Sequence, residues 1–81
     1  MKKTLSESVA VVVATARKKT NLSQEELASR SNLDRTYISG IERGVRNITL
    51  KSLERVVSGL EMTMADFLKE LMNEFTIHDK E

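Results

Sequence analysis

Apolar residues recur every three or four positions along this chain, which is the spacing of one face of an amphipathic α-helix. Polar residues that are typical of helix starts separate the apolar stretches. The chain has no proline and no Asn-Gly or Asp-Gly hairpin signal. The pattern therefore predicts an all-α domain with five helices, at about residues 6–19, 23–30, 35–43, 50–60 and 64–76.

The predicted helices at 6–19 and 50–60 each carry one narrow apolar face. The first is rich in β-branched valine, which also suits a strand, but no partner strand is available to pair with it. We therefore expect a helix there. The apolar faces consist of Val9, Val12, Val13 and Ala16 in the first helix and of Leu50, Leu53, Val57 and Leu60 in the fourth.

Several polar residues predict where the helices begin and end. Ser23 and Glu26 have the spacing of a capping box, so the second helix is expected to start at Ser23. Asn32 tolerates the left-handed conformation that ends a helix. Asp34 and Thr49 are suited to cap the third and fourth helices.

The predicted fifth helix has an unusually wide apolar stripe. A chain of 81 residues buries only about 60 to 65% of its unfolded surface, so this stripe exceeds what the domain can cover by itself. We expect part of it to meet a second copy of the chain, with a purely intramolecular core helix as the alternative. The predicted dimer-interface residues are Met64, Phe67, Leu68, Leu71, Met72 and Phe75.

Composition excludes several kinds of chemistry. The chain fits a single domain over residues 1–81 and contains no cysteine and one histidine, His78, which we expect to be solvent-exposed. It has no glycine-rich phosphate loop, no nucleophile with a neighbouring histidine and no obvious inward pair of carboxylates. We therefore expect a protein that is not an enzyme and holds no metal or cofactor.

The first residues imitate a secretory signal, because Lys2 and Lys3 precede an apolar run. Glu7 interrupts this region, and the continuous apolar run at 9–14 is too short to span a bilayer. We therefore expect a cytoplasmic protein without a membrane partner.

The net charge of +1 hides an uneven distribution. Residues 1–60 carry 11 Lys and Arg against 6 Asp and Glu, whereas residues 61–81 carry 2 against 6. A basic body suits a polyanion such as nucleic acid, although a solvated surface would give the same counts.

The predicted third helix has a polar outer face. At about 100° per residue, Ile38, Ile41 and Tyr37 fall on the arc opposite to that face. With the helix before it, this segment has the geometry of a helix-turn-helix, whose second helix enters the major groove of DNA. Arginine can bond guanine O6 and N7, and threonine can contact thymine. The predicted base-readout residues are Arg35, Thr36, Ser39 and Arg43.

Other interpretations of these residues remain open. Arg35 could contact a phosphate, or form a surface ion pair with Glu42 or Asp34. Thr36 could act as a second capping hydroxyl. Ser39 and Arg43 would meet bases or backbone depending on the tilt of the helix.

The segment before the fourth helix is suited to phosphate, because amides at a helix N-terminus and the helix dipole attract anions. A solvated loop, in which Asn and Thr serve only the turn and the cap, is the alternative. The predicted backbone contacts here are Arg46, Asn47, Thr49 and Lys51, with the Tyr37 hydroxyl added from the third helix.

Three motifs agree in order and spacing over residues 22–60: LSQEELA, SNLDRTYISGIERG and RNITLKSLERV. This stretch resembles the lambda-repressor-like (XRE) helix-turn-helix family, and within it the controller proteins of bacterial restriction-modification systems. The resemblance implies a five-helix all-α homodimer on pseudo-palindromic duplex operators. It also implies a helix-turn-helix core at about 22–60 and a dimerisation helix at about 64–76. Controllers of this kind regulate their own operon, which makes RNA polymerase an expected further partner.

The resemblance also assigns residues. It implies that Gln24 contacts a phosphate and that Arg17 and Glu42 form a structural ion pair. The family often has glycine where this chain has Asn32 and Glu61, and glutamate adopts a left-handed conformation poorly. A phage-type repressor or an antitoxin-type autoregulator would use the same fold. A protein-interaction module is the alternative from a different class.

Overall fold

The computed structural model describes residues 4–79 and the side chains of residues 4–76, so the side chain of His78 lies outside the described part. Within that range the chain forms five α-helices and no strand, which confirms the predicted all-α fold. The helices are α1 (Leu5–Lys19), α2 (Gln24–Ser31), α3 (Arg35–Glu42), α4 (Leu50–Gly59) and α5 (Met64–Asp79).

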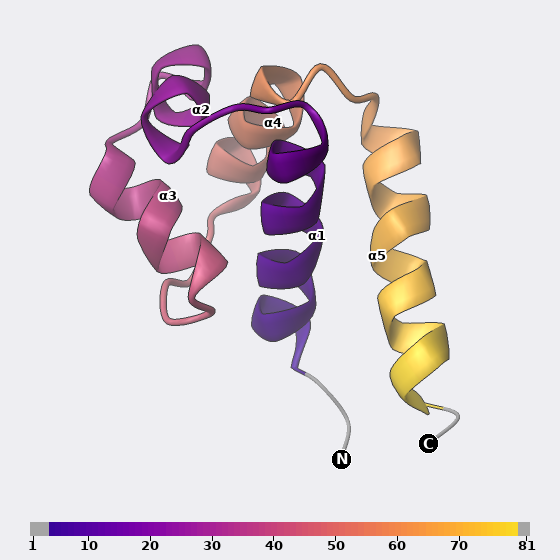
Figure 1. The fold of residues 1–81 in the computed structure, drawn as a ribbon. Coiled ribbons are helices and arrows are strands. Elements are labelled where there is room, and N and C mark those ends of the chain that lie inside the picture. The colour runs from indigo at the N-terminus through magenta and orange to yellow at the C-terminus, as the bar shows by residue number, and fades with distance from the viewer. Residues whose placement is uncertain (1–3, 80–81) are drawn as a thin grey trace.

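Helix α1 lies between α3 on one side and α5 on the other (Figure 1). Helix α2 packs against both α3 and α4, and α5 packs mainly on α1. These contacts enclose one hydrophobic core, and each large apolar side chain that it fully buries contributes about 1.5 to 3 kcal/mol. The largest fully buried apolar side chains are Phe67, Leu27, Ile38, Ile41, Val13 and Val56.

The helix caps follow the local sequence with one exception. The Ser23–Glu26 capping box is formed, and the Thr49 hydroxyl accepts the Ser52 amide as expected. Asp34 occupies the N-cap position of α3, but the prediction that its side chain caps the helix is wrong. The Tyr37 amide, which such a cap would bind, donates instead to the Asp34 carbonyl oxygen at 3.0 Å.

The turns that end α2 and α4 use the same backbone conformation. Asn32 has a φ of 55°, which confirms the left-handed residue predicted in the α2–α3 turn. Glu61 has a φ of 59° after α4, so glutamate adopts the conformation for which glycine is better suited. An exposed ion pair of 2.9 Å joins the Glu61 carboxylate to Arg30.

Helix α4 turns three of the four predicted positions toward the core, namely Leu53, Val57 and Leu60. Leu50 is instead 80% exposed. The prediction that Leu50 faces the core is wrong, although Leu50 lies only about 20° from Val57 around the helix. Leu50 is the first residue of α4, and the buried residues of this helix lie in its second half. The C-terminal end of α4 lies close to α2. A Cβ added to Gly59 would stand 2.6 Å from Ser31 Oγ, so a larger residue would force the Ser31 side chain or the two helices to shift.

Candidate nucleic-acid interface

The outer face of α3 presents Arg35 and Thr36 in its first turn, and both side chains are exposed. Neither side chain makes a hydrogen bond or ion pair with any residue that the structure describes. The alternative in which Arg35 pairs with Glu42 or Asp34 is therefore not observed, nor is a capping role for the Thr36 hydroxyl. Both donor groups are available to an external ligand.

The second turn of α3 continues this face. Arg43 is exposed at the C-cap, and its Nε lies 3.4 Å from the Ser39 carbonyl oxygen. The Ser39 side chain is half-buried. This half of the face is thus more restricted than the first turn, where the side chains extend without internal partners.

Tyr37 and Arg46 are brought together at the edge of α3. The Tyr37 ring is half-buried against the core, and the Arg46 guanidinium lies over it, 5.2 Å from the ring centroid. Gly40 makes room for this loop residue, since an added Cβ would stand 3.2 Å from Arg46 Cβ. The cation–π contact limits the positions of Arg46 while its charge stays exposed.

The connection from α3 to α4 lies beside this pair. Gly44 has a φ of 73°, which turns the chain away from α3, and the side chains at 45–47 are exposed. Thr49 Oγ1 accepts the Ser52 amide at 3.0 Å, and its hydroxyl hydrogen can still be donated. The exposed groups of this connection that can donate to a phosphate are Arg46, Asn47, Thr49 and Lys51.

At one edge of the outer face of α3, Arg17 on α1 and Glu42 on α3 form the predicted ion pair. Arg17 Nε donates to Glu42 Oε2 at 2.6 Å, and Arg17 Nη2 donates to Oε1 at 2.9 Å. The Gln24 side-chain amide also donates to Oε1, at 3.1 Å. The two charged side chains are only 13% and 7% exposed, so screening by solvent is weak.

The electrostatics of this group follow from its hydrogen bonds. Burial opposes ionisation of the Glu42 carboxyl, but the bonds from Arg17 and Gln24 and the charges of Arg17 and Lys18 outweigh it. The pKa of Glu42 therefore lies below its ordinary value, and the bond to Glu42 raises the pKa of Arg17. Glu42 stays ionised at neutral pH, and Arg17 neutralises it.

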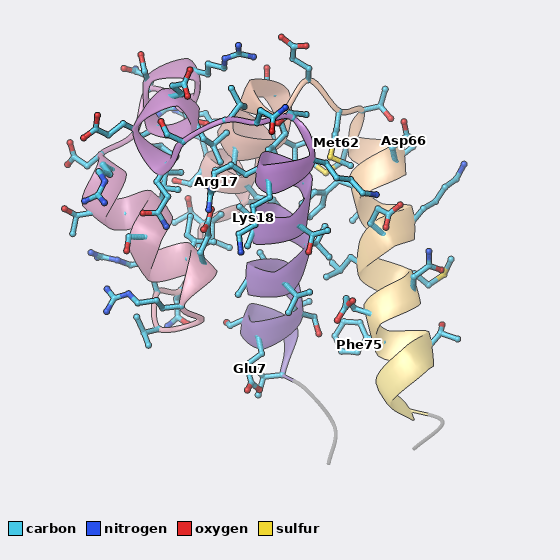
Figure 2. The ribbon with its side chains drawn as sticks, in the orientation of Figure 1. Glu7, Arg17, Lys18, Met62, Asp66 and Phe75 are labelled. Carbon is cyan, nitrogen blue, oxygen red and sulfur yellow. The ribbon has the colours of Figure 1, made fainter. Side chains whose placement is uncertain are left out.

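The predicted interface helix divides into two sets of residues. Leu68 and Met72 are 49% and 61% exposed, so they are available to a partner. Phe67 has no exposed surface, so its assignment to a dimer interface is wrong: the ring fills the core. Phase explains the difference, because residues 67 and 72 lie about 140° apart around the helix. The half-buried members are Met64, Leu71 and Phe75, the last of which lies on the α1 side of α5 (Figure 2).

The described residues lack two features that are typical of other classes of protein. None of the described helices is long and apolar enough to cross a membrane. Among the described side chains, those of residues 4–76, no group of three or more His, Cys, Asp or Glu could hold a metal ion.

The fold and the exposed α3 face define a helix-turn-helix protein. Residues 13–67 match the helix-turn-helix family model, so the chain belongs to this family. Among curated relatives, the control protein C.MunI from Mycoplasma sp is 43% identical over 58 residues, which are 72% of this chain and 78% of that protein. The control protein C.SmaI from Serratia marcescens is 41% identical over 64 residues, which are 79% and 76% of the two chains.

Solved structures agree with these relatives. The wild-type restriction-modification controller protein C.Esp1396I superposes with a TM-score of 0.90 at 45% identity, covering 95% of this chain and 100% of that chain. The C.Esp1396I tetramer in complex with its natural 35 base-pair operator gives a TM-score of 0.88 at 45% identity, covering 93% and 99%. The predicted family and fold are thereby confirmed.

Two features of the site were missed in the sequence. One is the stacking of Arg46 on Tyr37, and the other is the bond from Gln24 to Glu42. Both join residues on different elements, so helix periodicity carries no signal for them. A glycine at position 40, one turn after Thr36, was the available hint that another segment approaches α3 there.

Proposed function

We propose that this protein is a dimeric, sequence-specific regulator of transcription that binds double-stranded DNA and belongs to the restriction-modification controllers. The observation that carries this is the first turn of α3, where Arg35 and Thr36 are exposed and have no partner among the described residues. Donors without internal partners on a short exposed helix suit the major groove, where base edges supply the acceptors.

The place of each residue in the fold determines whether it is assigned to bases or to phosphates. Residues on the outer face of α3 read bases, whereas residues at helix N-termini and in the α3–α4 connection bind phosphates. The base-readout set is Arg35, Thr36, Ser39 and Arg43, and the backbone set is Gln24, Tyr37, Arg46, Asn47, Thr49 and Lys51.

Two copies would assemble through α5. Leu68 and Met72 give this helix an exposed apolar strip on a molecule of only 81 residues, and such strips are buried in homodimers. Residues 64–76 would form the dimerisation helix and residues 22–60 the DNA-binding core. A two-fold dimer presents α3 twice, which matches an operator with inverted half-sites.

The regulatory role rests on the relatives. C.MunI and C.SmaI are control proteins, and C.Esp1396I is a restriction-modification controller with a structure on its operator. By similarity, this chain would act in the cytoplasm on the promoter of its own restriction-modification operon and thereby affect RNA polymerase. A methyltransferase gene and an endonuclease gene next to its own would agree with this, whereas a toxin gene would favour an antitoxin.

The test of this proposal is to select bound duplexes from a random pool and to titrate the most enriched sequence in a mobility-shift assay. We expect an inverted repeat to emerge and to bind about 10³-fold or more tightly than random duplex. A protein-interaction module would instead retain no duplex, and micromolar protein at low salt would leave random DNA unretarded.

A further inference from the structure

The Arg17–Glu42–Gln24 group is more elaborate than an ion pair between two helices requires. Both oxygens of the Glu42 carboxylate accept from Arg17, and Oε1 accepts a second bond from the Gln24 amide. Arg17 Nη1 also donates to the Leu22 carbonyl oxygen at 2.8 Å, directly before α2. The group therefore fixes the start of α2 relative to α3 as well as joining α1 to α3.

Gln24 keeps donor capacity beyond this group. Its side-chain nitrogen carries two hydrogens, and the structure uses one of them for Glu42. Gln24 is also the first residue of α2, where the helix dipole favours a negative ligand. With one hydrogen held by Glu42, the direction of the other is set by the planar amide.

The location of Glu42 determines where the Gln24 amide lies relative to the outer face of α3. Glu42 follows Ser39 by three residues and Arg35 by seven, so it lies on the same edge of α3 as these two readout residues. The Gln24 amide that it holds therefore lies beside the outer face of α3. An unpaired carboxylate in this place would repel DNA, but the two bonds from Arg17 neutralise it.

We propose that Glu42 is a positioning residue for DNA binding, which holds the Gln24 amide so that its second N–H meets a phosphate oxygen. In this arrangement Arg17 has two roles: it fixes the Glu42 carboxylate and cancels a charge that would oppose the phosphate. The proposal rests on the proposed function, because it concerns how the same interface binds the backbone.

A double-mutant cycle separates positioning from stability. The probe is a random-sequence duplex, and dissociation constants are measured over a range of salt concentrations. In the native background, Gln24→Ala should weaken binding several-fold and leave the slope of log K against log salt nearly unchanged, because a neutral amide releases no counterion. In an R17M/E42L background, where apolar side chains replace the pair, Gln24→Ala should change the affinity less than two-fold, because the amide is already unoriented.

A conservative variant supplies the rescue. R17M/E42Q removes the ion pair but keeps an oxygen that can accept from Gln24. In this background Gln24→Ala should again weaken binding several-fold. Arg46→Ala is the control, and its effect should be equal in all three backgrounds because Arg46 stacks on Tyr37 and does not touch the group.

The outcomes distinguish the two proposals. If the native chain binds no duplex, the proposed function fails. If Gln24→Ala weakens binding equally in the native and R17M/E42L backgrounds, the DNA interface stands and the positioning role is wrong. Should R17M/E42L fail to fold, NMR of the native chain decides: duplex should shift the Gln24 side-chain amide signals, and unchanged signals would overturn the proposal.

Discussion

The outer faces of α3 and α5 are both exposed, but their chemistry differs. The α3 face carries arginine and hydroxyl side chains, whereas α5 exposes Leu68 and Met72. The two helices lie on opposite sides of α1 (Figure 1). Burying an apolar strip away from water is favourable in free energy. Charged donors are stabilised by hydrogen bonds to the acceptor oxygens of an anion. One small core thus supports two separate exposed surfaces, which suit two different kinds of partner.

The largest effect should come from a charge on the α5 face. Met72→Lys places a cation in the proposed interface, and two-fold symmetry repeats the loss, so dimerisation should weaken by about 3 kcal/mol or more. Sedimentation equilibrium measures this directly. Asn73→Lys adds the same charge one position away and should leave the dimer intact. Equal dimer affinity for both variants would remove α5 from the interface.

The next effect concerns the α3 face. Arg35→Ala should cost about 1 to 3 kcal/mol on the selected duplex and relax the base preference at one position in each half-site. Fluorescence anisotropy with single-base variants of the duplex checks both results. Arg55→Ala removes an exposed cation from α4 and serves as the control. An equal loss on specific and random DNA would mean that Arg35 reads no base.

Arg46 tests the other half of the proposed DNA interface, the contacts to phosphate. Arg46→Ala should weaken binding to every duplex to a similar extent, by about 1 kcal/mol or less, and reduce the salt slope by about one. The same titrations on specific and random duplex measure it. Lys19→Ala, which removes an exposed cation at the end of α1, should leave the slope unchanged. A loss confined to the specific duplex would place Arg46 on a base.

Acid should destabilise the fold by protonating Glu42 in its ion pair with Arg17. The pKa of Glu42 is lowered in the folded protein, so its stabilisation is present above the ordinary carboxyl pKa and is lost as pH falls below it. Between about pH 5 and pH 3, Tm should fall by a few °C more in the native chain than in R17M/E42L. Calorimetry over this pH range measures Tm for both proteins. Parallel curves of Tm against pH would contradict the prediction.

The smallest effect is expected at the turn before α5. Glu61 has a φ of 59°, so Glu61→Gly should stabilise the fold by up to about 1 kcal/mol by removing strain. Glu61→Ala is the matched control, since it also loses the Arg30 ion pair but keeps the strain. Urea denaturation compares the two. Equal stabilities would show that the turn stores no strain at this residue.

Local features of the fold could be predicted because each depends on a few neighbouring residues. Ser23 and Glu26 lie three positions apart on one turn, and Asn32 tolerates the left-handed region by its own chemistry. The exposed positions of Arg35 and Thr36 follow from helical phase alone. Their roles on DNA remain proposals.

Features that depend on how helices pack could not be predicted. Leu50 and Phe67 belong to apolar stripes, but the packing of each helix decides which positions of a stripe are buried, and both assignments failed. The Asp34 side chain lost its capping role because a backbone carbonyl accepted the same amide. The bond from Gln24 to Glu42 joins residues 18 positions apart, where no sequence spacing rule applies.

The contact between Gly59 and Ser31 has a consequence for recognition. Because α2 and α4 meet with no space for a methyl group, these two helices can shift little relative to each other. In the proposed dimer, two such units would present α3 at a fixed separation, and the duplex would have to adapt to it. Operators whose central steps bend easily should therefore be preferred, even at base pairs that no side chain touches.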